Sequence, residues 1–147
     1  MNDQMLNENR PKMVELFKYA PMKKAFEMEL HYNQQGSAIF QMPYQEKFNH
    51  TFGSVHGGVL STLLDNAGWF TVAPYYENWI TTVDLQVQFL KTTSNLDLRS
   101  IGHIVKVGKS ISFARMEVID SENKMVAYAS GTFSVTTKKI DLDKFII

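Results

Sequence analysis

The stretch from Ser54 to Phe70 constrains the fold most, because it combines a long helical period with residues that a buried helix seldom contains. Its apolar positions recur at intervals of three and four residues, as on one face of a helix: Val59, Leu63, Ala67 and Phe70, widened by Leu60 and Leu64. Gly57 and Gly58 begin the run, at a cost in backbone entropy, and let another group approach the main chain closely. Asp65 interrupts the apolar face, where a carboxylate rarely lies without a partner or a task. The stretch therefore predicts a central helix that carries chemistry.

Segments with an alternating period of two flank this helix and predict strands. Before it, residues 26–42 predict a hairpin with its turn at 33–36. After it, four more strands are expected, at residues 82–89, 97–107, 111–119 and 125–135. In the first of these, one apolar face is expected to hold Val83, Leu85, Val87 and Phe89. One long helix against a mostly antiparallel sheet is an α+β arrangement of two layers.

Local irregularities and the chain ends complete this outline. The alternation of apolar residues shifts near Ser100 and again near Phe113, which indicates bulges or bends in the strands. Residues 1–10 are polar and expected to fray, and Pro11 suits the first turn of a short helix that Pro21 ends. The whole chain, 1–147, is expected to form a single domain with its core at about 26–136, flanked by the N-terminal helix and a C-terminal tail.

Composition narrows the classes of partner and compartment. Fifteen basic residues balance fifteen acidic ones, so nothing favours nucleic acid or a membrane surface as a partner. The absence of cysteine excludes disulfides and thiolate metal sites, and the four histidines lack metal-ligand spacing, so no metal site is expected. No apolar run approaches a signal sequence or a membrane span. A cytoplasmic protein is therefore expected.

Three motifs occur in one order: His56-Gly57-Gly58 followed by Leu64-Asp65-Asn66, then Thr82-Val83-Asp84-Leu85, then Val107-Gly108-Lys109-Ser110. Together they resemble the hotdog-fold acyl-CoA thioesterases, in particular the phenylacetyl-CoA thioesterase branch, over roughly residues 26–136. The resemblance implies a hotdog fold, with an antiparallel sheet wrapped around one central helix. It also implies hydrolysis of an acyl-CoA to a carboxylic acid and coenzyme A. No cofactor is expected, because coenzyme A is part of the substrate.

The glycine pair suits a site for the oxygen of a thioester. A helix start exposes unpaired N–H groups and carries partial positive charge. Gly57 and Gly58 have no side chains that would keep a thioester carbonyl from these donors, and the resemblance implies that Gly57 N–H is the donor. The alternative is a glycine turn that simply admits the helix to the sheet.

Asp65 is the candidate for the chemical step. It would act as general base on water, or as nucleophile through a transient anhydride, and burial is expected to raise its pKa. Alternatively, Asp65 caps a neighbouring backbone group. Thr82 matches a hydroxyl position of the family and would hold the Asp65 carboxylate or the attacking water, although threonine is also common in strands.

The polar residues before the helix leave their roles open. His56 would protonate the leaving thiolate or orient the loop, and orientation is favoured because thiolates leave well without a proton. The family often carries an asparagine six residues before this histidine. Here His50 takes that place with Asn49 beside it, so either residue is a candidate for the second polar site position.

Further residues are expected to bind the substrate. Lys109, in a turn with Gly108 and Ser110, would meet the phosphates of coenzyme A, although a lysine in a turn is often only solvated. Trp69 would line the acyl pocket, and it is equally suited to the core. The acyl chain itself is not encoded in any of these motifs.

Two other functions remain open: a hotdog enoyl-CoA hydratase or dehydratase, and a non-catalytic acyl-CoA-binding module. Asp65 favours hydrolysis over both. In a helix, nine residues separate His56 from Asp65 by about 13 Å and place them on opposite faces. One chain therefore cannot bring the donor at the helix start to the carboxylate. A homodimer with shared sites is expected, paired through the strand at 82–89, and it could further assemble as a dimer of dimers, a homotetramer.

Overall fold

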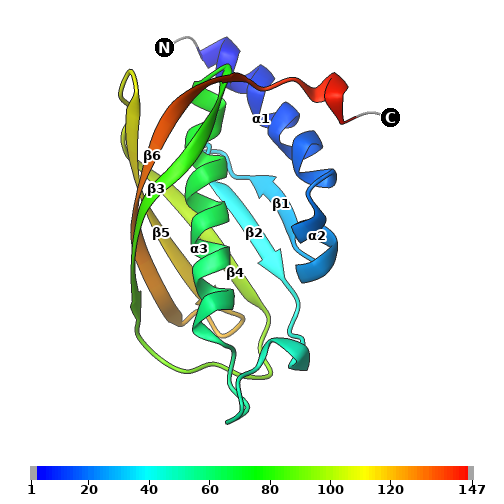
Figure 1. Ribbon diagram of the computed structural model, residues 1–147. Helices are drawn as coiled ribbons and strands as arrows, with labels where there is room; N and C mark the ends of the chain where they lie inside the picture. Colours follow the sequence, from blue (N-terminus) through cyan, green and yellow to red (C-terminus); the bar gives the residue numbers. More distant parts are fainter. Residues whose placement is uncertain (1–2, 146–147) are drawn as a thin grey trace.

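The computed structural model describes residues 3–145, in which one long helix lies against the concave face of a curved sheet (Figure 1). The helix is α3 (Gly57–Val72), and the six antiparallel strands run in the order β1-β2-β4-β5-β6-β3. The strands are β1 (Glu29–Tyr32), β2 (Ala38–Met42), β3 (Asn78–Phe89), β4 (Leu98–Lys106), β5 (Ile111–Asp120) and β6 (Met125–Lys139). The expected α+β hotdog fold is confirmed.

The N-terminal segment differs from expectation. Helix α1 (Asp3–Lys18) already begins at Asp3, with Pro11 inside it, because the side chain of Leu6 is buried and Asn9 donates a hydrogen bond to the Pro74 carbonyl. Residues 1–2, which were also expected to fray, lie outside the described residues. No helix within residues 3–145 is long and apolar enough to span a membrane.

Pro21 does more than end α1, because it starts a second helix, α2 (Pro21–Phe26). Phe26 therefore belongs to this helix rather than to the first strand, and its ring stacks on Phe48 at 4.7 Å. The described residues also contain three short 3₁₀ helices: η1 (Glu46–Phe48), η2 (Ala73–Tyr75) and η3 (Leu142–Lys144).

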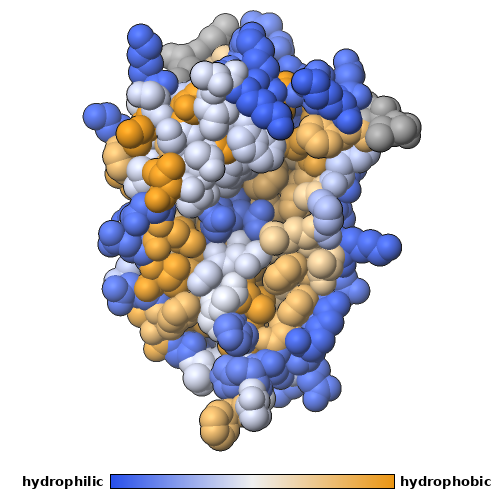
Figure 2. Space-filling view, in the orientation of Figure 1, coloured by the Kyte–Doolittle hydropathy of each residue, from blue (hydrophilic) through white to orange (hydrophobic). Residues whose placement is uncertain are grey.

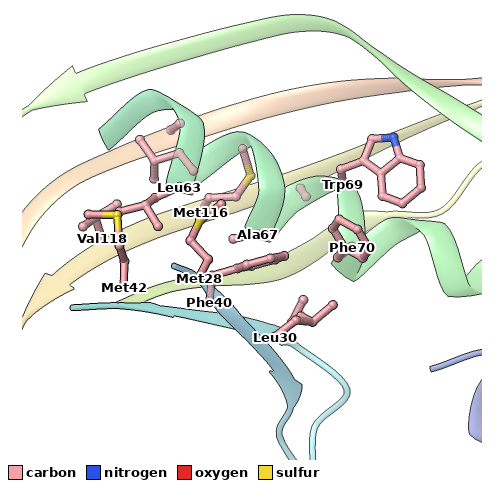
Figure 3. Packing of buried hydrophobic residues seen from close by; sticks show 14 of the residues in the cluster. Met28, Leu30, Phe40, Met42, Leu63, Ala67, Trp69, Phe70, Met116 and Val118 are labelled. Carbon is pink, nitrogen blue, oxygen red and sulfur yellow. The ribbon is translucent and has the colours of Figure 1, made fainter. Parts of the chain in front are cut away.

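The core lies between α3 and the sheet (Figure 3). Leu63 and Ala67 of α3 are fully buried, as are Phe40 of β2 and Met116 of β5. The helix approaches β4 closely at Gly102, where a Cβ atom would lie 2.4 Å from the Ala67 carbonyl oxygen. This contact fixes the position of α3 against the sheet, because only glycine leaves room for the helix backbone there.

A bulge in β3 changes the expected facing of its side chains. Thr82 pairs with Phe133 and Asp84 with Thr132, which leaves Val83 as an extra residue. Thr82 therefore lies on the same inward face as Leu85, whereas strict alternation places the two on opposite faces. The bulge expected near Phe113 is confirmed by a register shift between Ile104 and Lys106, but pairing around Ser100 is regular. Within the described chain, β3 pairs only with β6 and its other edge is unpaired.

Candidate active site

Four residues of α3 spaced four apart form a stripe toward β3: Gly57, Ser61, Asp65 and Trp69. Gly57 lies against Phe89 at the end of β3, Asp65 is hydrogen-bonded to Thr82, and Trp69 to Ile80. The side of α3 outside the core appears in Figure 2 as a pale and blue strip between more hydrophobic surface on either side. The stripe therefore places the Asp65 carboxylate and the backbone of Gly57 on one side of α3, next to apolar surface.

Asp65 is half-buried and has one hydrogen-bond partner. Thr82 Oγ1 donates to Asp65 Oδ1 at 2.7 Å, and within residues 3–145 the second oxygen, Oδ2, accepts no hydrogen bond. Burial raises the pKa of the Asp65 carboxyl above its ordinary value of 3.8, and the bond from Thr82 offsets part of that shift. The carboxylate therefore has a fixed orientation and a free oxygen that can accept a proton.

The start of α3 leaves one backbone donor open. His56 Nδ1 accepts a hydrogen bond from Gly58 N–H at 2.8 Å and so caps the helix. Among the described residues, nothing accepts a hydrogen bond from Gly57 N–H. Because Nδ1 of His56 is an acceptor here, the imidazole is neutral and carries its proton on Nε2. Gly57 N–H is thus available to a ligand, whereas Gly58 N–H is occupied.

One chain does not bring Gly57 and Asp65 together. Eight residues separate them in α3, which is about 12 Å of helix at 1.5 Å per residue. A thioester bonded to Gly57 N–H through its carbonyl oxygen therefore lies out of reach of the Asp65 carboxylate of the same chain.

The two candidates for the second polar position turn toward their own loop. Asn49 Nδ2 donates to Tyr44 Oη at 2.8 Å, while its buried Oδ1 has no partner in the described chain. His50 Nδ1 accepts from Phe52 N–H at 3.1 Å. Neither side chain hydrogen-bonds to α3, so the structure does not choose between them.

The turn between β4 and β5 lies at the opposite end of the molecule from the start of α3 (Figure 1). Tyr76 Oη bonds to the Gly108 carbonyl and to Ser112 Oγ, which in turn accepts from Gly108 N–H. This network fixes the backbone of the turn and leaves Lys109 and Ser110 exposed. Within residues 3–145, Lys109 forms no ion pair, and it lies far from Gly57 of the same chain (Figure 1).

Trp69 is fixed at the other end of the stripe, one helical turn beyond Asp65. Its indole N–H donates to the Ile80 carbonyl at 2.8 Å, and its ring is 4.7 Å from those of Phe70 and Trp79. Only 9% of the residue is exposed. Trp69 therefore belongs to the core and also walls the stripe beyond Asp65.

Two residues beside the predicted site residues were not predicted: Phe89, which contacts Gly57, and Tyr76, which holds the turn that contains Lys109. Phe89 was expected only on the apolar face of a strand, and no pattern marked Tyr76, because its partners lie more than thirty residues away. A cavity of about 450 Å³ lies away from the stripe, among residues of the first two strands and the ends of β4 and β5, and none of the predicted site residues lines it. Residues 3–145 contain no cluster of side chains suited to hold a metal ion.

Several known proteins resemble the chain. A family model described as "Thioesterase superfamily" matches residues 52–127, just over half of the chain. A relative in Halobacterium salinarum, which carries the provisional name of an esterase, is 34% identical over 114 residues, covering 68% of this chain and 74% of that protein. Human acyl-coenzyme A thioesterase 13 is 24% identical over 105 residues, covering 66% and 71%. The fold of the E. coli PaaI protein, from the phenylacetic acid degradation operon, matches with a TM-score of 0.82 at 19% identity, over 94% of this chain and 98% of that one.

Proposed function

Because the chain belongs to the thioesterase superfamily, we propose that it hydrolyses an acyl-CoA thioester to the free carboxylic acid and coenzyme A. The names of the family and of its relatives support thioester hydrolysis in general, and the name of the human relative supports an acyl-CoA as the substrate. The observation that carries the proposal is the Asp65 carboxylate, half-buried beside an exposed helix face, with a raised pKa and one free oxygen.

The proposed reaction uses Asp65 and Gly57 on the two sides of the thioester. A water oxygen attacks the carbonyl carbon while Asp65 Oδ2 takes the proton from the water. The carbonyl oxygen gains negative charge, and Gly57 N–H at the positive end of α3 stabilises it. Collapse of the tetrahedral intermediate breaks the C–S bond, and the coenzyme A thiolate leaves. Direct attack by Asp65 through an anhydride uses the same two groups, with water hydrolysing the anhydride afterwards.

The remaining polar residues have supporting roles in this proposal. Thr82 orients the carboxylate, and His56 holds the helix start by capping Gly58. While Nδ1 of His56 accepts the bond from Gly58 N–H, the imidazole is not an imidazolium and cannot protonate the thiolate, which leaves without a proton, so the role proposed for His56 is orientation. Asn49 and His50 stay candidates for a polar contact to the substrate.

We further propose that the active unit is a homodimer with shared sites. The 12 Å between Gly57 and Asp65 requires a second chain, and a twofold axis that places two α3 helices antiparallel brings each Gly57 near the partner's carboxylate. The unpaired edge of β3 supports such pairing, and Val83, 56% exposed at the bulge, adds apolar surface to that strand. The same axis also brings the Lys109 end of one chain toward the helix start of the other.

The test of the reaction is release of free thiol from a panel of acyl-CoA substrates. The wild-type chain is expected to release thiol from at least one of them, and Asp84→Asn, a change of an exposed aspartate on β3, should match it. If the wild type binds acyl-CoA and releases no thiol, it is a binding module instead. Release of a hydrated or dehydrated acyl-CoA would identify a hydratase.

The test of the shared site mixes two damaged chains. Asp65→Ala removes the carboxylate, and Gly57→Pro removes the donor; each parent dimer is expected to be inactive. Mixed dimers should regain one working site in two. Mixed dimers that stay inactive while both parents assemble, or a fully active monomer, would contradict the shared site.

Lys109 is proposed to bind the phosphates of coenzyme A. Lys109→Ala should raise KM for acyl-CoA much more than KM for a short thioester that lacks the nucleotide, because only acyl-CoA carries phosphates. Lys124→Ala, which changes an exposed lysine of another turn, is the matched control. Equal changes in KM for both substrates would show that Lys109 does not bind the phosphates of coenzyme A.

A further inference from the structure

Phe89 lies at the start of α3 without a role in the core. It is the last residue of β3, on the same inward face as Leu85 and Val87, which pack against the buried cluster. Phe89 is outside that cluster, and 55% of it is exposed. An aromatic ring that is more than half exposed contributes little to folding by burial, so its position needs another explanation.

The far edge of the ring points at the α-carbon of Gly57. A Cβ atom on Gly57 would lie 3.1 Å from Phe89 Cζ and 3.2 Å from Cε1, and the three atoms nearest to it all belong to this ring. A side chain at position 57 would therefore require the ring to shift by a few tenths of an ångström. The ring is therefore an apolar wall beside the first residue of α3, whose backbone N–H has no acceptor within residues 3–145.

Two backbone hydrogen bonds fix the position of Phe89 relative to Gly57. Directly after Phe89, Leu90 N–H donates to the Val126 carbonyl at 2.8 Å, which fixes the end of β3 to the start of β6. Four residues after Phe89, the Thr93 carbonyl accepts from Val55 N–H at 2.9 Å, which fixes the same loop to the turn before the helix. The ring and Gly57 N–H are therefore positioned together rather than by chance contact.

We propose that Phe89 is a wall of the oxyanion site: its ring excludes water from one side of Gly57 N–H and packs against the apolar atoms next to the thioester carbonyl. A backbone donor that is shielded from water stabilises developing negative charge more strongly than a hydrated one. This inference rests on the proposed thioesterase function, which places the carbonyl oxygen at Gly57. It adds a substrate-contacting residue that the polar motifs do not include.

The experiment is a double-mutant cycle on kcat and KM with Gly57→Ala, Phe89→Ala and the double variant. Phe89→Ala should lower kcat about tenfold, part of the 10²–10³ that loss of a whole oxyanion donor costs, with a smaller change in KM. Gly57→Ala should lower kcat in the wild type because its methyl group shifts the ring away from the start of α3. In the Phe89→Ala background the same change should cost less than about twofold, because the ring is gone.

Matched controls separate the wall from general effects of large-to-small changes. Leu90→Ala alters the next residue, which is 51% exposed, and Phe113→Ala alters a similarly exposed phenylalanine on β5. Both should keep wild-type kcat. Phe89→Leu keeps apolar bulk and should recover most of the lost rate, and a thermal melt shows that each variant is folded.

The outcomes separate the wall from the proposed function. An active wild type with unchanged kcat in Phe89→Ala, or multiplicative losses in the double variant, would overturn the wall and leave the thioesterase intact. A wild type that releases no thiol would overturn the proposed function. In that case the wall is tested by measuring the affinity for an acyl-CoA analogue that has CH₂ in place of sulfur. Phe89→Ala should bind it a few-fold more weakly, in line with the small change expected in KM, and equal affinity, or no binding by the wild type, would overturn the wall as well.

Discussion

Asp65 and Asp120 are both removed from water, yet their pKa values are displaced in opposite directions. Asp120 is only 1% exposed, but its carboxylate accepts hydrogen bonds from the N–H groups of Lys124 and Glu122 and from the Lys91 ammonium group. These donors, the Lys124 N–H first, hold the pKa of Asp120 below 3.8 in spite of burial. Asp65 has the Thr82 hydroxyl alone, and burial raises its pKa.

The difference shows that the supply of hydrogen-bond donors, rather than burial itself, decides whether the pKa of a carboxyl in this protein is lowered or raised. Asp120 closes the turn between β5 and β6, and both of its carboxylate oxygens accept hydrogen bonds inside the protein. Asp65 keeps one oxygen without a hydrogen bond from residues 3–145, and burial disfavours its ionised form. A carboxylate whose pKa is raised is a stronger base than an ordinary one, so it accepts a proton from water more readily.

The largest expected effect is on catalysis at Asp65. Asp65→Asn should lower kcat by about 10²–10⁴, because the neutral amide keeps the shape of the side chain and cannot act as a base. Its free energy of unfolding at pH 7 should equal or exceed that of the wild type, since the cost of a half-buried charge is gone. Thiol release and urea denaturation measure the two effects, and a folded variant with near-native kcat would remove Asp65 from the reaction.

The next effect is on stability at Asp120. Asp120→Ala should lower the free energy of unfolding by about 3 kcal/mol, because it leaves two backbone N–H groups and Lys91 without their acceptor. Asp120→Asn keeps one acceptor oxygen and should lose less. Urea denaturation gives the comparison, and kcat of the folded fraction should stay unchanged. A loss of stability below about 0.5 kcal/mol in Asp120→Ala would show that the donors find other partners.

Much of the fold was predictable because it depends on local periodicity. The helix at Gly57–Val72 and the strands that follow it are encoded by intervals of three and four residues or of two. The start of α1 at Asp3 was missed because polar residues hide its buried positions, and contacts such as the one from Asn9 to Pro74 join distant segments. The second helix was missed because Pro21 was taken only as a helix end.

The candidate site was predictable where one short segment holds the chemistry. The His-Gly-Gly turn and Asp65 are readable within α3, because an open backbone and a carboxylate are anomalies in an apolar run. The side of the sheet on which Thr82 lies could not be predicted, because it depends on the bulge at Val83. That bulge is seen only in the pairing of β3 with β6. Phe89 over Gly57 is likewise a contact between segments thirty-two residues apart, for which no local pattern gives a signal.

A smaller effect distinguishes the two carboxylates by the pH dependence of stability. The pKa of Asp120 is lowered by folding, so its contribution is present above the ordinary pKa of 3.8 and is lost as pH falls through the folded value. The pKa of Asp65 is raised by folding, so its ionisation costs stability above 3.8 and this cost disappears as pH falls below 3.8. As the pH falls from 7 to 3, the loss in free energy of unfolding caused by Asp120→Asn should become smaller. The gain in free energy of unfolding caused by Asp65→Asn should also become smaller. Urea denaturation at four pH values tests both, and a difference that is constant with pH would contradict the corresponding shift.

The smallest expected effect concerns the one donor that Asp65 has. Thr82→Val removes the hydroxyl that lowers the pKa of Asp65, so that pKa should rise further. Since the base must be ionised, the acidic limb of the pH profile of kcat should move to higher pH, while well above that limb kcat should fall only a few-fold from loss of orientation. Thr82→Ser keeps the hydroxyl and should keep the limb in place. Thr81→Val, which changes the exposed neighbour on β3, is the matched control. If the acidic limb of Thr82→Val stays where it is in the wild type, Thr82 does not govern the ionisation of Asp65, and a water molecule or a partner chain supplies that bond instead.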